Sequence, residues 1–183
     1  DQLDNWETAE QRNLASDDCV AVAELYNDWP LGLEEPSEIL TLKGWTADRT
    51  RYVKIYAPLG ERHDGRMKDA AGNYTGVALT VDGSNGDAGI TIVSAYTRFE
   101  GVIVDKKGEG GAMSVYGPDA GGPSYIDSCI IGNLESSGIF IYGTGSIVTN
   151  TLVFNSTAGA AFEGGNGSVA SFYNCTAVDS MVG

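Results

Sequence analysis

The chain has 183 residues, 42% of them apolar, which is enough for one domain with a packed core. Its formal charge of −14 and isoelectric point of about 4.2 argue against nucleic-acid binding, because phosphate contacts require clustered Lys and Arg. No apolar run approaches the roughly 18 residues that a membrane-spanning helix requires, so we expect no membrane insertion. The last cation is Lys107, which leaves residues 108–183 with acidic charge alone.

The chain begins with a stretch of helical character. Residues 3–15 place apolar side chains, from Leu3 to Leu14, roughly on one face of a helix. Residues 1–18 are therefore predicted to form an N-terminal cap. From residue 19 to 183, short runs of Val, Ile, Tyr and Phe alternate with Gly-rich turns, and this pattern predicts an all-β unit.

Two long loops interrupt the first strands of this unit. Residues 59–76 contain the only histidine, His63, beside Asp64. A His with a carboxylate could act as a base, but adjacent side chains rarely face one another, so a role in stabilising the loop is favoured.

The second loop, residues 82–89, contains Asp82 and Asp87, whose oxygen atoms could bind calcium. A tight Gly-rich turn explains the same residues and is favoured over a calcium site. Apart from this candidate Ca²⁺ ion, no cofactor is expected. Three cysteines cannot all pair, and we interpret them as free core residues: Cys19, Cys129 and Cys175.

One pattern occurs four times in the C-terminal half, at offsets of 27, 22 and 24 residues. The repeats are 99–105, 126–133, 148–155 and 172–179. Each begins with an apolar residue and has, two positions later, a residue suited to a bend; a second short strand follows the first three. A period of roughly 20 to 30 residues with short strands predicts a solenoid, and the strand content selects a parallel β-helix.

Polar residues at fixed places in these repeats are predicted to stack from one turn to the next. The expected ladder positions are Asp105, Asn133, Asn155 and Asp179 at the strand ends, and Asn150 and Asn174 at the bends. The last repeat has no second strand, so we expect the C-terminal end of the solenoid to be incomplete or covered by another chain.

If alternate residues of the repeat face the core, Ile103, Ile130 and Leu152 face outward. An outward apolar stripe requires a cover, which could be a partner subunit, a loop of the same chain, or lateral packing in a homo-oligomer.

Aromatic residues offer a possible carbohydrate site. Tyr116 and Tyr142 occupy equivalent positions in two repeats, and Glu163 follows at the next. Tyrosine rings could stack on sugars, although packing against the sheet is the favoured explanation. We find no catalytic residues: Asp127 and Glu135 lie at opposite ends of one segment, so no carboxylate pair of a glycosidase is evident.

The segments "YNDWP", "GWTADRTRYVKIYAPLGERHDG" and "ITIVSAYTRFEGVIVD" resemble right-handed parallel β-helix proteins of the pectate-lyase-like superfamily, of the kind found in tailed bacteriophages and bacterial surface proteins. The resemblance implies a right-handed solenoid and contact with carbohydrate. The Asp-Asp and Gly-His-Gly motifs of its polygalacturonases are absent, and so is a lyase arginine on the repeats.

These features predict a non-enzymatic structural or adhesive protein on a virion surface, such as a capsid decoration, spike or tail protein. Its expected partners are copies of itself, other virion subunits or a cell-surface polysaccharide. The alternatives are an enzyme that degrades polysaccharide, as a lyase or glycosidase, and an adhesin on a bacterial surface.

Overall fold

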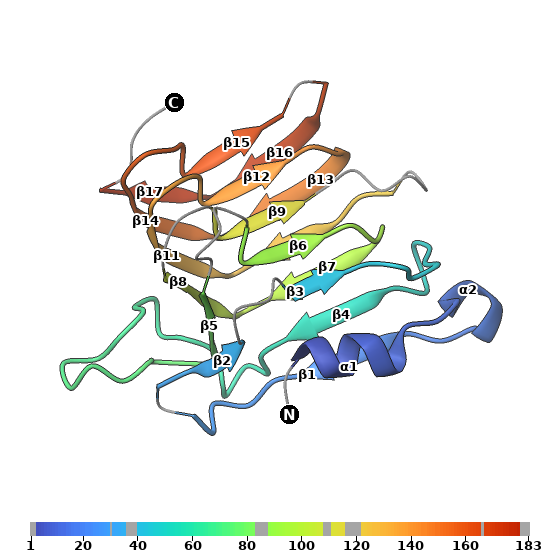
Figure 1. Ribbon diagram of the computed structural model, residues 1–183, viewed down its shortest axis with the longest axis horizontal. Coiled ribbons are helices and arrows are strands. Elements are labelled where there is room, and N and C mark those ends of the chain that lie inside the picture. Colours follow the sequence, from blue (N-terminus) through green and yellow to red (C-terminus); the bar gives the residue numbers. More distant parts are fainter. Residues whose placement is uncertain are drawn as a thin grey trace.

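The computed structural model of the chain is a parallel β-solenoid with helices at its N-terminal end (Figure 1). It describes residues 3–29, 31–35, 40–82, 88–107, 111–115, 122–165 and 167–179. The chain passes through three parallel sheets in a fixed order, so each strand pairs with its counterpart in the neighbouring turn, and all but the end strands of each sheet pair on both sides. The predicted all-β solenoid is therefore confirmed.

The first sheet has six strands: β1 (Ala21–Glu24), β4 (Val53–Tyr56), β7 (Thr97–Glu100), β10 (Tyr125–Asp127), β13 (Thr144–Thr149) and β16 (Val169–Tyr173). The second also has six: β2 (Leu33–Glu35), β5 (Ala78–Asp82), β8 (Ile103–Lys107), β11 (Ile130–Leu134), β14 (Leu152–Ser156) and β17 (Thr176–Val178). The third has five: β3 (Leu40–Leu42), β6 (Ile90–Ile92), β9 (Met113–Val115), β12 (Ile139–Ile141) and β15 (Phe162–Gly164).

The register of the first two sheets follows the sequence repeat. In the first sheet the residues that open the four repeats stack in one row: Phe99, Ile126, Val148 and Phe172. In the second sheet another row is formed by Val104, Ile131, Val153 and Ala177. Most of these side chains lie in the main core, which runs the length of the solenoid and buries the inward face of all three sheets.

The bends between the first and second sheets need backbone of positive φ. Ser128, Asn150 and Asn174 have φ angles of 54°, 51° and 52°, and Gly101 has 73°. Asn tolerates this region better than most residues and Gly adopts it without strain, which explains the residue types at this place in the repeat.

Two ladders of side-chain hydrogen bonds run along the solenoid. They include the predicted positions Asp105, Asn133, Asn155, Asn150 and Asn174, together with Asp127, which was not predicted as a ladder residue. In the bend ladder, Asn174 donates to Asn150 over 2.7 Å, and Asn150 donates to Asp127 over 2.8 Å. In the strand-end ladder, Asn155 donates to Asn133 over 3.3 Å, and Asn133 donates to Asp105 over 2.7 Å.

The strand-end ladder positions differ in two respects from the expectation. Asn133, Asn155 and Asp179 all have positive φ, as residues at a bend do. Asp105 does not end its strand, because β8 continues to Lys107 and pairs with β5 up to Asp82.

The N-terminal cap consists of two short helices, α1 (Leu3–Glu10) and α2 (Leu14–Asp17), in place of one helix over 3–15. The break falls at Asn13, whose side chain accepts a hydrogen bond from Ser16 N and thereby starts the second helix. Helix α1 contacts strands β1 and β3 (Figure 1). Its buried Glu7 accepts hydrogen bonds from Trp45 Nε1 and from the backbone N of Lys43, both 3.1 Å long.

The loop between β4 and β5, residues 59–76, covers the outer face of the second sheet, and we call it the covering loop. Its Met67 and Tyr74 form a second apolar cluster with Ile103 and Ile130. Those two isoleucines do point away from the main core as predicted, but they are only 0% and 1% exposed. The stripe is therefore buried by the chain itself, and the assignment of Ile103 and Ile130 to an oligomer interface is wrong.

Leu152, the third residue of the stripe, is half-buried and packs against the same cluster. The covering loop is attached to the solenoid by polar contacts at Asp105, a residue only 2% exposed. The Tyr74 hydroxyl donates to Asp105, and Lys68 Nζ lies 3.3 Å from the same carboxylate. His63 adds a contact between its Nε2 and Ser128 O, 2.8 Å apart, which agrees with the loop-stabilising role favoured above.

Candidate ligand-binding groove on the first sheet

The outer face of the first sheet carries an open groove of about 530 Å³. Strands β7, β10 and β13 form its floor, because every second residue of these strands points away from the core. Its lining residues are Arg49, Tyr96, Arg98, Glu100, Tyr125, Asp127, Ile147 and Thr149.

Aromatic rings and an arginine form one row across the groove. Arg98 pairs in register with Tyr125, and its guanidinium carbon lies 5.7 Å from the centre of that ring. The same carbon lies 3.6 Å from the ring centre of Tyr52, in the segment that precedes β4. Contact with two rings holds the guanidinium in place and leaves its N–H groups as preorganised donors.

A row of carboxylates lies beside the aromatic row. Glu100 and Asp127 are direct partners on neighbouring parallel strands, whose backbones are about 4.8 Å apart. Glu100 forms ion pairs with Lys54 at 2.9 Å and with Arg62 at 3.7 Å. Asp127 accepts hydrogen bonds from Thr149, Asn150 and Ser128.

These donors keep Asp127 ionised. Burial alone would raise the pKa of this carboxyl, but the hydrogen bonds from Thr149, Asn150 and Ser128 outweigh burial and hold its pKa below the ordinary value. A general acid of a glycosidase needs the opposite, a carboxyl whose pKa is raised so that it carries a proton. Asp127 is thus suited to accept hydrogen bonds from a ligand and poorly suited to donate a proton.

The groove therefore combines flat apolar surfaces with fixed donors and acceptors. Tyr96 and Tyr125 offer ring faces, Arg98 offers N–H donors, and Asp127 offers carboxylate oxygens. This combination suits a ligand with hydroxyl groups on an otherwise apolar ring, which is the chemistry of a sugar.

The residues predicted for carbohydrate binding lie elsewhere. Tyr142 follows β12 in the third sheet, is 47% exposed, and packs on Phe140 at 4.2 Å between ring centres. Glu163 lies on β15, where its carboxylate accepts a 2.7 Å hydrogen bond from Ser137. The register pairs Glu163 with Phe140, so Glu163 is not equivalent to Tyr142. Tyr116 lies outside the described residues.

The described residues support neither a metal site nor a reactive cysteine. Asp87 lies outside the described residues, as does the side chain of Asp82. Within the part of the chain that the structure describes, no group of three or more His, Cys, Asp or Glu side chains could hold a metal ion. All three cysteines are free, and burial raises the pKa of the Cys129 thiol to about 12.

Sequence reasoning missed the Glu100–Asp127 pair although the signal was present. Aligning repeat 99–105 with repeat 126–133 puts Phe99 opposite Ile126, and the next residue in each repeat is then one of these two acids. Asp127 and Glu135 lie in one segment, whereas Glu100 and Asp127 come from the same position in two consecutive turns.

Among the described residues, no helix is long and apolar enough to cross a membrane. Comparisons with protein-family models, curated proteins and solved structures find no match to this chain. The fold and the groove define its class as a parallel β-solenoid that carries a candidate ligand groove on its first sheet.

Proposed function

We propose that this protein is a non-enzymatic, adhesive β-solenoid that binds a polysaccharide along the outer face of the first sheet. The observation that carries the proposal is the row of Tyr52, Arg98 and Tyr125 beside the acids of the groove. Successive strands lie about 4.8 Å apart, and the outward row Lys54, Arg98 and Tyr125 would give an extended chain of sugars two cationic groups and one ring on consecutive turns.

The proposal favours binding over cleavage. The carboxylate pair at Glu100 and Asp127 is held by cations and hydrogen-bond donors, and the pKa of Asp127 is lowered. A polysaccharide-degrading lyase or glycosidase is the second candidate, favoured by the close approach of two acids on neighbouring strands.

The binding test is titration of the purified chain with panels of cell-surface polysaccharides, with Tyr125→Ala as the groove variant. Loss of one stacked ring is expected to weaken binding about two- to tenfold. Tyr142→Ala is the matched control, because it removes an exposed tyrosine from the third sheet. Equal loss in both variants, or loss only in Tyr142→Ala, would place binding outside the groove.

Cleavage is tested with the same polysaccharides by following their chain length. An adhesive protein leaves the length unchanged, and shortening that Asp127→Asn abolishes would establish the enzyme instead. In either case the binding titration shows whether the groove is the site.

The proposed setting is a virion surface, as a decoration, spike or tail protein of the pectate-lyase-like kind, with a bacterial surface adhesin as the alternative. Support comes from the solenoid fold together with the resemblance described above. Quantitative mass spectrometry of purified particles tests the setting: a fixed copy number relative to a capsid or tail subunit is expected, and absence of the chain from particles would overturn it.

A further inference from the structure

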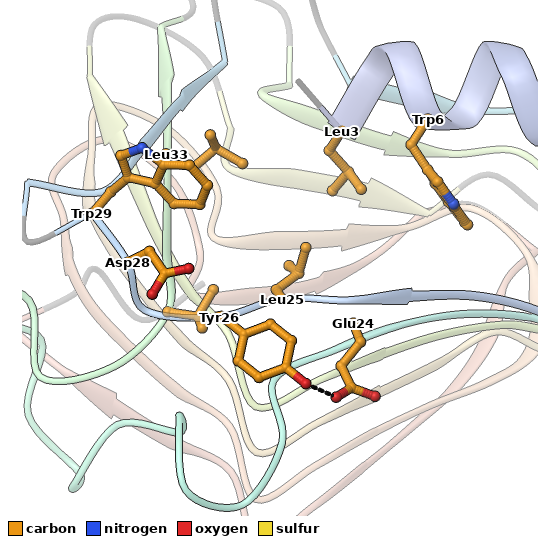
Figure 2. A pocket seen from close by; sticks show the side chains of 9 residues that line it. Leu3, Trp6, Glu24, Leu25, Tyr26, Asp28, Trp29 and Leu33 are labelled. Atoms are coloured by element: carbon orange, nitrogen blue, oxygen red, sulfur yellow. Dashed lines mark hydrogen bonds between the residues drawn. The ribbon is translucent and has the colours of Figure 1, made fainter. Parts of the chain in front are cut away.

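A separate pocket of about 250 Å³ lies at the N-terminal end of the solenoid, away from the groove. Its walls come from helix α1, from strand β1 and the segment that follows it, and from β2. Figure 2 shows Trp29 and Leu33 on one side of the open space, Leu3 and Trp6 on the other, and Leu25 between them.

The inner surface of the pocket is apolar and aromatic. The aliphatic side chains are Leu3, Leu25, Leu33 and Val77, and the rings are those of Trp6, Tyr26 and Trp29. Trp29 and Tyr26 are 49% and 48% exposed, which is unusual for such large side chains and leaves their faces accessible to a ligand.

The charged groups at the pocket are both acidic. Glu24 and Asp28 are exposed at its edge, and the described residues that line it include no Lys, Arg or His. Glu24 accepts hydrogen bonds from the hydroxyls of Tyr26 and Tyr56 (Figure 2 shows the first). These bonds lower the pKa of Glu24, with the bond from Tyr26 the largest cause, so its carboxylate keeps its negative charge to lower pH than an ordinary glutamate does.

From this arrangement we infer that the pocket binds a small organic cation, an alkylated ammonium group on a short apolar body. Aromatic faces attract such a cation through their quadrupoles, and an alkylated nitrogen needs no hydrogen-bond acceptors of its own. The carboxylates of Glu24 and Asp28 supply the complementary charge, and the aliphatic residues accommodate the apolar body. An anionic ligand would be repelled by both acids, and a sugar would find few donors there.

Choline is the probe, and its neutral isostere 3,3-dimethylbutan-1-ol is the comparison, because the two differ chiefly in the charge. We expect choline to bind at least about tenfold more tightly than the neutral alcohol, and its affinity to fall as salt rises. Binding is followed by calorimetry and by the indole N–H signals in NMR, where Trp29 should shift more than the buried Trp45.

Two variants separate the contributions. Trp29→Leu removes a ring and keeps an apolar side chain, and it should weaken choline binding about fivefold or more. Asp28→Asn keeps the shape and removes a charge, so it should weaken binding and flatten the salt dependence. Tyr142→Leu, an aromatic of similar exposure on the third sheet, is the control and should bind like the wild type.

Equal binding of choline and its neutral isostere would overturn the proposal and identify a purely apolar pocket. Absence of choline binding in the folded wild-type chain would also overturn it. Melting temperatures of all variants are compared first, because Trp29 is half-exposed and its replacement should leave the fold intact.

Discussion

Replacing Ile130 by Ala tests whether the covering loop or another chain buries the outer face of the second sheet. Ile130 is 1% exposed, and the second cluster around it includes two side chains of the covering loop, Met67 and Tyr74, as well as residues of the sheet. If the loop is the cover, the substitution opens a space between loop and sheet and lowers the stability of the monomer.

The magnitude follows from the buried carbons. The change removes three carbon atoms, worth about 0.8 kcal/mol each, or about 2.4 kcal/mol in total. An unfilled cavity adds to this cost, but a loop can settle into the space better than a sheet can, so we expect about 3 kcal/mol. Ile147→Ala is the control, because Ile147 is half-buried on the outer face of the first sheet, and it should cost less than about 1 kcal/mol.

Urea unfolding gives the change in the free energy of unfolding, and trypsin reports on the loop. The loop contains Arg62, Arg66 and Lys68, so its release in the Ile130→Ala protein should speed cleavage there. Wild-type stability and trypsin resistance, together with a fall in solution mass from oligomer to monomer, would refute the reasoning and return Ile130 to an interface between chains.

Four further predictions concern the polar contacts and a thiol. Asn133→Ala should lose about 2 kcal/mol, because it strains a residue at φ 61° and breaks the ladder on both sides, while Asn133→Gly should lose less in the same unfolding assay. Tyr74→Phe removes the hydroxyl that donates to buried Asp105 and should cost about 1 to 3 kcal/mol and speed trypsin cleavage of the covering loop. Native Cys129 should resist thiol reagents at pH 8 while Cys19, which is less buried, reacts; reaction of both at one rate would contradict the assigned burial. Because folding raises the pKa of Cys129 from 9.0 to about 12, its contribution to stability is complete below pH 9 and is lost as pH rises toward 12, which pH-dependent unfolding of Cys129→Ala against wild type would measure.

The register of the solenoid was predictable because identical positions in parallel strands must satisfy identical constraints. A bend of positive φ selects Gly or Asn, and a core position selects an apolar side chain, so Gly101, Asn150 and Asn174 mark the turns in the sequence itself. The third sheet could be predicted only in part, because its strands are three residues long and too short to show a clear alternation of apolar and polar residues.

The covering loop and the N-terminal pocket were harder to predict for a different reason. Residues 59–76 have no periodicity, so the sequence gives no indication that Met67 and Tyr74 lie against the stripe of Ile103 and Ile130. The N-terminal pocket is lined by residues of α1 and residues that follow β1. These segments lie outside the four sequence repeats. Sites made by non-repeating segments must be found in three dimensions.

Both asparagine ladders have a single polarity. Every amide donates toward the preceding turn, and each ladder ends there on an aspartate, Asp127 in one and Asp105 in the other. An asparagine both donates and accepts, so it can pass the pattern on, whereas a carboxylate only accepts and therefore stops it. Each aspartate also accepts hydrogen bonds from other partners, from the covering loop at Asp105 and from Thr149 and Ser128 at Asp127. Neither aspartate occupies the asparagine position itself: the register pairs Asp105 with Gly132 and Asp127 with Thr149, one residue before Asn133 and Asn150. Each ladder therefore stops where a carboxylate at the neighbouring strand position accepts its last amide.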